Sequence, residues 1–221
     1  MASGKISLSM MCAGIVGIEK IIQKAESAGI EFLHIDIMDG SFVPNITLGT
    51  MFLSELRQLS KIPIDLHLLI QDPEKKLDWF GIQKGDRVAV HWESSRSILE
   101  AVTNIQAVGA QAVVALNPGT PVSVLDEVIG HLDGVLLMMT NPGFSGRKLI
   151  ESCIPKVDHL RKYAAKRGRD DLEIEVDGNV SFSNAKRLKK QGADIFVAGS
   201  SSIFSGNDFL KLTQKLRTAV K

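Results

Sequence analysis

Four polar residues interrupt apolar stretches of the chain in a pattern that could hold a metal ion. His34 and Asp36 stand two residues apart in one apolar run, His67 lies inside a second run, and Asp177 ends a third. In a strand, residues two apart point to the same face. Two imidazoles and two carboxylates suit zinc, manganese, iron or cobalt better than magnesium or calcium. The pattern therefore predicts a divalent metal site, with zinc favoured because it accepts His and Asp ligands readily.

The same residues also have a purely structural interpretation. Taken alone, a histidine such as His67 is more often a hydrogen-bonded core residue than a metal ligand. A buried carboxylate without a partner is costly, so Asp36 and Asp177 are harder to explain in that way. All four residues together favour the metal site.

Three glycine-containing segments that follow later apolar runs could bind phosphate. They cover residues 141–146, 177–179 and 199–202. Glycines let backbone N–H groups approach an anion closely, although tight turns without a ligand have the same composition. The candidate substrate contacts in these segments are Gly143, Phe144, Ser145, Gly146, Asp177, Gly178, Asn179, Gly199 and Ser200.

The elements that would carry these residues are short apolar runs separated by segments of helical length. Most runs are apolar along their whole length, as expected for strands buried on both faces of a parallel sheet. Eight such runs can be counted, at residues 6–11, 32–38, 64–70, 87–91, 112–116, 134–139, 172–176 and 195–198.

Three of the intervening segments have clear helical character and end at a glycine just before the next strand. They cover residues 18–28, 97–108 and 184–191. Pro121 also fits the first turn of a helix, with Thr120 as its cap.

This alternation of strands and helices predicts an α/β protein with a single (β/α)8 barrel over residues 1–221. An open, doubly wound sheet is less favoured because no G-x-G-x-x-G turn follows the first strand. Barrels of this kind build their sites at the C-terminal ends of the strands, where the polar residues above stand.

Composition narrows the partners that the protein is expected to have. The chain has 26 basic and 25 acidic residues, which argues against a nucleic-acid or anionic-membrane surface. Its two cysteines, Cys12 and Cys153, lack metal-ligand spacing and fit a reducing compartment. No leader or long apolar run is apparent, so we expect a cytoplasmic location.

Five motifs make the chain resemble the ribulose-phosphate 3-epimerase family, which includes D-allulose-6-phosphate 3-epimerases. They lie at residues 34–45, 65–68, 116–118, 141–144 and 173–178, and the resemblance extends over residues 6–204. It implies a 1,1-proton transfer on a ketose phosphate through an enediolate, interconverting D-ribulose 5-phosphate and D-xylulose 5-phosphate. It also implies a homo-oligomer, either a dimer or a hexamer.

The resemblance gives roles to individual residues. It implies that His34, Asp36, His67 and Asp177 bind a divalent metal and that the two aspartates are the acid and base. It further implies substrate contacts from Ser9, Met38, His67 and Met138. A cation can stabilise the charge of an enediolate, and inversion requires proton donors on both faces of the carbon.

Departures from the family pattern leave alternatives open. Leu8 and Leu69 replace a common proline and methionine, and Asn179 replaces a frequent glycine. Residues 199–204 and 9–12 look closer to the allulose-phosphate branch of the family, so D-allulose 6-phosphate is an alternative substrate. Arg147 in the sixth loop either contacts phosphate or faces solvent.

Two rival functions use the same fold. Barrels of the decarboxylase and hexulose-phosphate synthase group rely on Asp-x-Lys-x-x-Asp, whereas the second strand here contains Asp36-Ile-Met-Asp39, without the lysine. A barrel that binds sugar phosphate without turnover is the other rival, and the intact pair of aspartates argues against it.

Overall fold

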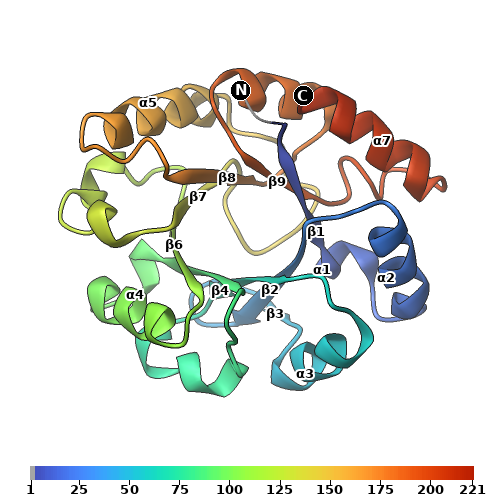
Figure 1. Ribbon diagram of the computed structural model, residues 1–221, viewed down its shortest axis with the longest axis horizontal. Helices are drawn as coiled ribbons and strands as arrows, with labels where there is room; N and C mark the ends of the chain where they lie inside the picture. Colours follow the sequence, from blue (N-terminus) through green and yellow to red (C-terminus); the bar gives the residue numbers. More distant parts are fainter. Residues whose placement is uncertain (1–2) are drawn as a thin grey trace.

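All eight apolar runs form strands in the computed structural model, which describes residues 3–221 (Figure 1). The first two residues of the predicted domain lie outside the described range. Strand β1 pairs in parallel with both β9 and β2, and this closes a parallel barrel. The predicted (β/α)8 barrel is thus confirmed. Its strands are β1 (Lys5–Ser9), β2 (Phe32–Asp39), β4 (Ile64–Leu69), β5 (Arg87–His91), β6 (Gln111–Leu116), β7 (Gly134–Met138), β8 (Glu173–Asp177) and β9 (Ile195–Ala198).

Helices surround the barrel, and a short strand, β3 (Ile46–Thr47), pairs antiparallel with the end of β2. The α-helices are α1 (Met10–Ala13), α2 (Ile18–Ser27), α3 (Thr50–Leu59), α4 (Ile98–Ala107), α5 (Ile154–Ala165), α6 (Phe182–Lys190) and α7 (Phe209–Ala219). The predicted helix-ending glycines Gly29, Gly109 and Gly192 all have positive φ, which L-residues with side chains adopt only at a cost.

Short 3₁₀ helices replace α-helices in two of the connections. The β4–β5 connection contains η1 (Pro73–Lys75) and η2 (Leu77–Phe80), and the β6–β7 connection contains η4 (Val122–Leu125) and η5 (Ile129–His131). The remaining ones are η3 (Trp92–Ser94) and η6 (Glu151–Cys153).

The prediction that Pro121 lies in the first turn of a helix capped by Thr120 is wrong by one position: a 3₁₀ helix follows, but it begins at Val122 and Pro121 itself occupies the cap position. Pro121 has extended backbone angles and precedes the 3₁₀ helix η4. The Thr120 hydroxyl does not cap a helix because it donates a hydrogen bond to Glu93 instead.

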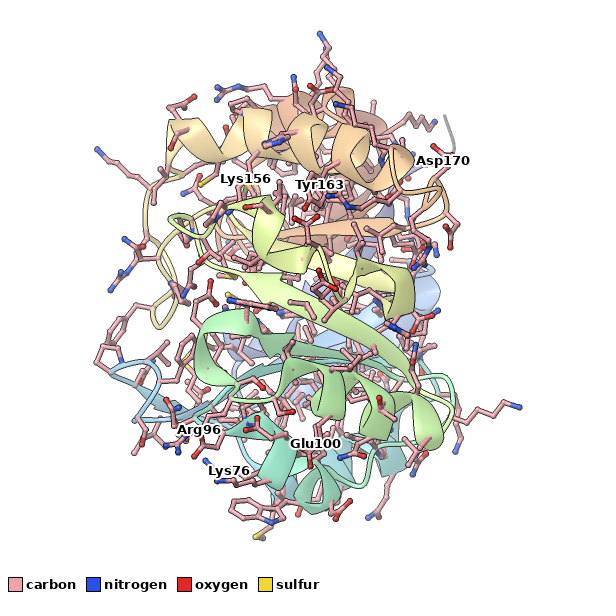
Figure 2. All side chains as sticks on the ribbon, turned by 90° about the vertical axis from the view of Figure 1, so that its left-hand side faces the viewer. Lys76, Arg96, Glu100, Lys156, Tyr163 and Asp170 are labelled. Atoms are coloured by element: carbon pink, nitrogen blue, oxygen red, sulfur yellow. The ribbon has the colours of Figure 1, made fainter. Side chains whose placement is uncertain are left out.

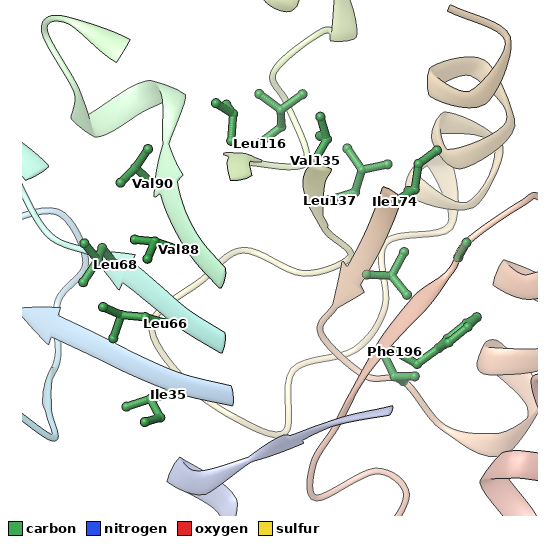
Figure 3. Close-up of a cluster of buried hydrophobic side chains, with 14 of the residues drawn as sticks. Ile35, Leu66, Leu68, Val88, Val90, Leu116, Val135, Leu137, Ile174 and Phe196 are labelled. Carbon is green, nitrogen blue, oxygen red and sulfur yellow. The ribbon is translucent and has the colours of Figure 1, made fainter. Parts of the chain in front are cut away.

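The larger part of the core lies between the barrel and its helices. Side chains of alternate strand residues point away from the barrel axis toward the helices, among them Ile35, Leu66, Val88, Leu137 and Phe196 (Figure 3). A smaller apolar cluster fills part of the barrel interior and comprises Ala89, Val113, Ala115, Leu136 and Met138. Because side chains alternate along a strand, the residues between the outward-facing ones are available to build a site inside the barrel.

The two ends of the described chain meet beside the barrel (Figure 1). The Gly4 N–H donates a hydrogen bond to the Val220 carbonyl at 2.8 Å, which ties the segment before β1 to the end of α7. A Cβ atom at Gly4 would lie 2.6 Å from the Phe196 ring, so only glycine fits this close approach. None of the helices in residues 3–221 combines the length and apolar character that a membrane span requires.

Candidate functional site

The structure brings His34, Asp36, His67 and Asp177 together inside the barrel. His34 and Asp36 come from β2, His67 comes from β4 directly opposite Asp36, and Asp177 is the last residue of β8. One ligand atom from each residue can be chosen so that all four lie within 4.8 Å of one another. The spacing of two residues along β2 therefore places both side chains on the interior face, as the sequence predicts.

The geometry of this cluster fits a divalent cation. His67 Nδ1 lies 3.0 Å and His34 Nε2 lies 3.3 Å from Asp36 Oδ1, and His67 Nδ1 lies 3.9 Å from Asp177 Oδ2. His34 Nε2 is fully buried and has no hydrogen-bond partner within the described residues. An unpaired buried nitrogen facing two carboxylates is what a mixed nitrogen and oxygen metal site requires.

Without a cation, the charges of the cluster strongly perturb its titration. Burial acts to raise the pKa of Asp36, but His34 and His67 outweigh it and hold that pKa below the ordinary range. Burial and then the charge of Asp36 raise the pKa of Asp177. Burial acts to lower the pKa of His34, yet Asp36 and Asp65 raise it well above its usual value. Protons and a metal ion therefore compete for the same atoms.

A buried carboxylate on the neighbouring strand orients His34. His34 Nδ1 lies 2.7 Å from Asp65 Oδ2, which also accepts a hydrogen bond from the Ser7 hydroxyl at 2.6 Å. Asp65 stands opposite His34 in the β2–β4 register. A carboxylate in this position accepts a hydrogen bond from Nδ1–H, which keeps the proton on that nitrogen and leaves His34 Nε2 free to bind a cation.

Toward the N-terminal ends of the strands, the barrel interior contains further charged side chains. The Arg87 guanidinium donates to Glu173 Oε2 at 2.6 Å and lies 3.6 Å from Glu175 Oε2. Glu175 is fully buried, and burial and the nearby Asp65 raise its pKa well above the usual value. The sequence analysis did not single out Asp65, Arg87 or Glu175. For Asp65 and Glu175 the available signal was their position two residues before His67 and Asp177 on the same strands, whereas Arg87 lies on β5, where no candidate residue had been identified.

A cavity opens above Asp36 and Asp177 at the C-terminal ends of the strands. Every predicted substrate contact lines it except His67, which is buried behind Asp36. The predicted residues in its lining are Ser9, Met38, Met138, Gly143, Phe144, Ser145, Gly146, Asp177, Gly178, Asn179, Gly199 and Ser200. The lining also contains Met11, Cys12, Leu69, Thr140, Arg147, Val180, Val197 and Ser201, which were not among the predicted contacts.

The glycine-containing loops form one wall of this cavity and are tied to each other. Gly178 has a φ of +105°, and a Cβ atom there would lie 2.6 Å from Thr140 Oγ1, so a glycine is required directly after Asp177. The Asn179 side chain donates to the Arg147 carbonyl at 2.9 Å, which joins the β8 loop to the β7 loop. These contacts fix the loops next to the carboxylates.

Arg147 lies on this wall with its guanidinium 5.5 Å from the centre of the Phe144 ring. Both residues line the cavity together with Gly178, Asn179 and Ser200. The arrangement places a permanent positive charge beside the loops whose glycines suit phosphate.

Asp39, at the end of β2, holds the loop on the other side of the site. Its carboxylate accepts hydrogen bonds from the N–H groups of Ser41 at 2.9 Å, Phe42 at 3.2 Å and Gln71 at 3.0 Å, and from Lys76 Nζ at 3.1 Å. Burial acts to raise the pKa of Asp39, but these donors outweigh it and lower the pKa to about 2. The charged form of Asp39 therefore fixes the β2–β3 loop against the segment after β4.

Comparison with known sequences gives one consistent family. The model of the ribulose-phosphate 3 epimerase family matches residues 5–204. The chain is 37% identical over 213 residues to a ribulose-phosphate 3-epimerase of Bacillus subtilis (strain 168), covering 96% of this chain and 98% of that protein. It is 38% identical over 216 residues to the chloroplastic ribulose-5-phosphate-3-epimerase of Arabidopsis thaliana, covering 97% and 76%.

Similar solved structures share the fold at lower sequence identity. A 3-hexulose-6-phosphate synthase has a TM-score of 0.66 and 18% identity, with complete coverage of both chains. Orotidine 5′-phosphate decarboxylase from Pyrococcus horikoshii OT3 has a TM-score of 0.64 and 17% identity, covering 97% of this chain and 98% of that one. At these identities the similarity concerns the barrel alone.

Proposed function

Because the chain belongs to the ribulose-phosphate 3-epimerase family and is an isomerase acting on carbohydrates, we propose that it interconverts D-ribulose 5-phosphate and D-xylulose 5-phosphate. One observation carries this proposal: Asp36 and Asp177 both line a single cavity, whose outer wall is made of glycine-containing loops. They come from β2 and β8, which β9 and β1 separate in the barrel. Two carboxylates can therefore approach a bound ketose from different directions.

The proposed reaction moves one proton off C3 and another proton on. One aspartate takes the C3 proton, the electron pair of the C–H bond forms a C2=C3 double bond, and the π pair of the C2 carbonyl moves to its oxygen to give an enediolate. The other aspartate, protonated, then delivers its proton to the opposite face of C3, and the carbonyl forms again. Asp36 and Asp177 exchange these roles when the reaction runs in the other direction. Met38 and Met138 line the cavity and would limit the access of water.

A divalent cation is proposed as the cofactor. His34 Nε2, His67 Nδ1 and one carboxylate oxygen each from Asp36 and Asp177 would hold it. Such a cation supplies electrostatic stabilisation of the negative charge that develops on the substrate oxygens. The mixed ligand set favours zinc, with manganese, iron and cobalt as the other candidates.

The substrate is best tested by proton exchange with the solvent. Incubation of the metal-loaded protein with D-ribulose 5-phosphate in deuterium oxide is expected to yield D-xylulose 5-phosphate carrying deuterium at C3. D-Allulose 6-phosphate is the alternative substrate, and its kcat/KM is expected to be lower because the named relatives act on the pentose phosphate. Nuclear magnetic resonance of the products would measure deuterium at C3 for both sugars. Absence of label with both sugars would contradict an epimerase of either kind, including the proposed one.

Arg147 is proposed to contact the substrate phosphate. Replacing Arg147 with glutamine is expected to raise KM for ribulose 5-phosphate between about 10-fold and 100-fold with little change in kcat, since a hydrogen bond to a charged group contributes about 1.5–3 kcal/mol. Steady-state kinetics at constant ionic strength would measure this. Lys148→Gln, which removes the neighbouring charge outside the cavity lining, is the matched control. Equal KM values for Arg147→Gln and the parent would place the guanidinium in solvent.

We also propose that the protein forms a homo-oligomer, either a dimer or a hexamer, and that it is located in the cytoplasm. Light scattering of the purified protein would give the number of subunits.

A further inference from the structure

A buried chain of hydrogen bonds runs from His67 away from the cluster. His67 Nε2 lies 2.9 Å from His91 Nε2, and His91 Nδ1 lies 3.1 Å from Glu93 Oε2. The two imidazole rings meet at their edges, with their planes 25° apart and their centres 5.1 Å apart. Both histidines are fully buried, whereas the Glu93 side chain is 21% exposed. His91 and Glu93 lie outside the lining of the cavity, so neither is placed to touch a substrate.

These contacts indicate which nitrogen of each histidine carries a proton. A carboxylate only accepts hydrogen bonds, so His91 must carry its proton on Nδ1, facing Glu93. Neutral His91 then accepts at Nε2, and the proton between the two rings belongs to His67 Nε2. This leaves His67 Nδ1 without a proton. The Asp36 carboxylate, 3.0 Å away, also only accepts hydrogen bonds, so this tautomer is favoured when a cation is bound between the two atoms. In the reverse order, a bare His91 nitrogen would face the carboxylate and His67 Nδ1 would carry a proton.

Glu93 is itself held in place by the segment after β6. Its Oε1 accepts hydrogen bonds from the Asn117 N–H at 2.8 Å and from the Thr120 hydroxyl, which leaves Oε2 for His91. Lys156 on α5, labelled in Figure 2, donates to the Asn117 carbonyl at 2.9 Å. Burial acts to raise the pKa of Glu93, but its hydrogen bonds outweigh it and lower the pKa to about 2. Glu93 is therefore a fixed, charged acceptor.

The two histidines of the cluster are thus supported in different ways. His34 meets its carboxylate, Asp65, directly at 2.7 Å, whereas one imidazole separates His67 from Glu93. We propose that His91 and Glu93 are positioning residues that hold His67 in the tautomer and orientation that bind the cation. This inference rests on the metal set of the proposed function. It goes beyond that set because it places determinants of metal affinity at the end of β5 and in η3, outside the four candidate ligands.

Metal affinity tests the inference without relying on turnover. Co²⁺ binding, measured by competition with a chromophoric chelator, is expected to be about 10- to 100-fold weaker in Glu93→Gln than in the parent. The glutamine amide can turn its NH₂ group toward His91. The donors and acceptors of the His67–His91 hydrogen bonds can then exchange roles. His91→Phe removes the acceptor for His67 and is expected to weaken binding by a similar factor. Long-range nitrogen–proton spectra of labelled, zinc-loaded parent are expected to show His67 protonated on Nε2 and His91 on Nδ1.

Thr120→Val is the matched control because it removes another partner of Glu93 while the carboxylate and His91 remain. Its affinity for Co²⁺ is expected to stay within about threefold of the parent. A parent-like affinity of Glu93→Gln for Co²⁺ would overturn the inference. If His91→Phe fails to fold, the result for Glu93→Gln alone is the test. A parent that binds no Co²⁺ would overturn the metal set and this inference together. A parent that binds Co²⁺ but epimerises neither sugar would contradict only the proposed reaction.

Discussion

Replacing Asp177 with asparagine is expected to lower kcat for ribulose 5-phosphate between about a hundredfold and ten-thousandfold, the range typical for loss of a general acid or base. Asparagine keeps the size of the side chain but can neither accept nor deliver the transferred proton. Asp177 also belongs to the metal cluster, so the loss is expected toward the upper end of that range. Steady-state kinetics with metal-saturated enzyme would measure it. Full activity would remove Asp177 from the mechanism.

Asp171→Asn provides a matched control for this variant. Asp171 precedes the same strand, at the other end of the barrel, and its side chain is 69% exposed. We expect parent-like kcat for Asp171→Asn and similar thermal unfolding curves for both variants. A large loss of activity in both would point to a general effect on β8 instead of a specific role for Asp177.

Removing the metal is expected to abolish activity. The candidate ligands His34 and His67 are fully buried, and the unpaired His34 Nε2 faces Asp36, so the cluster without a cation leaves polar atoms unsatisfied. Protein treated with a chelator and then dialysed should regain turnover with Zn²⁺, Mn²⁺, Fe²⁺ or Co²⁺, and much less with Mg²⁺ or Ca²⁺. Recovery on addition of metal is also the control against irreversible damage.

Metal should also stabilise the fold by a measurable amount. Because the ligands come together only in the folded barrel, free metal at a hundred times Kd is expected to add about 2.7 kcal/mol to the free energy of unfolding. Thermal unfolding with and without Zn²⁺ would detect this, and the cluster variant His34→Gln should lose the effect. Full activity in protein shown by elemental analysis to contain no metal would contradict the proposed cofactor.

Most of the fold could be predicted from local patterns. The strands were identified because both faces of a parallel sheet are buried, which makes runs such as 112–116 apolar throughout. The helices before Gly29, Gly109 and Gly192 were identified because a glycine follows each of them. Glycine readily adopts the left-handed conformation that ends a helix. The prediction for the β6–β7 connection was wrong because proline is equally compatible with the extended backbone that Pro121 adopts just before a 3₁₀ helix. The Thr120 hydroxyl donates to Glu93, which is distant in sequence, and such a contact cannot be read from the local pattern around Pro121.

The candidate site could be predicted in part. The spacing of His34 and Asp36 is visible in the sequence because it depends on one strand alone. The pairing of His34 with Asp65 depends on the register between two strands, and the chain from His67 through His91 depends on ring orientation. Neither quantity follows from the order of residues, so the residues that orient the candidate ligands were not identified.

The closing seam of the barrel has a consequence for biosynthesis. Strand β1 completes its pairing with β9, where Lys5 stands opposite Ile195, so the seam closes only after nearly the whole chain has left the ribosome. Contacts between such distant segments form slowly. Asp177 lies on one side of this seam and the other three cluster residues lie on the other side. The full set of four ligands therefore comes together only when the seam has closed, whereas the three on β2 and β4 need only the pairing of those two strands.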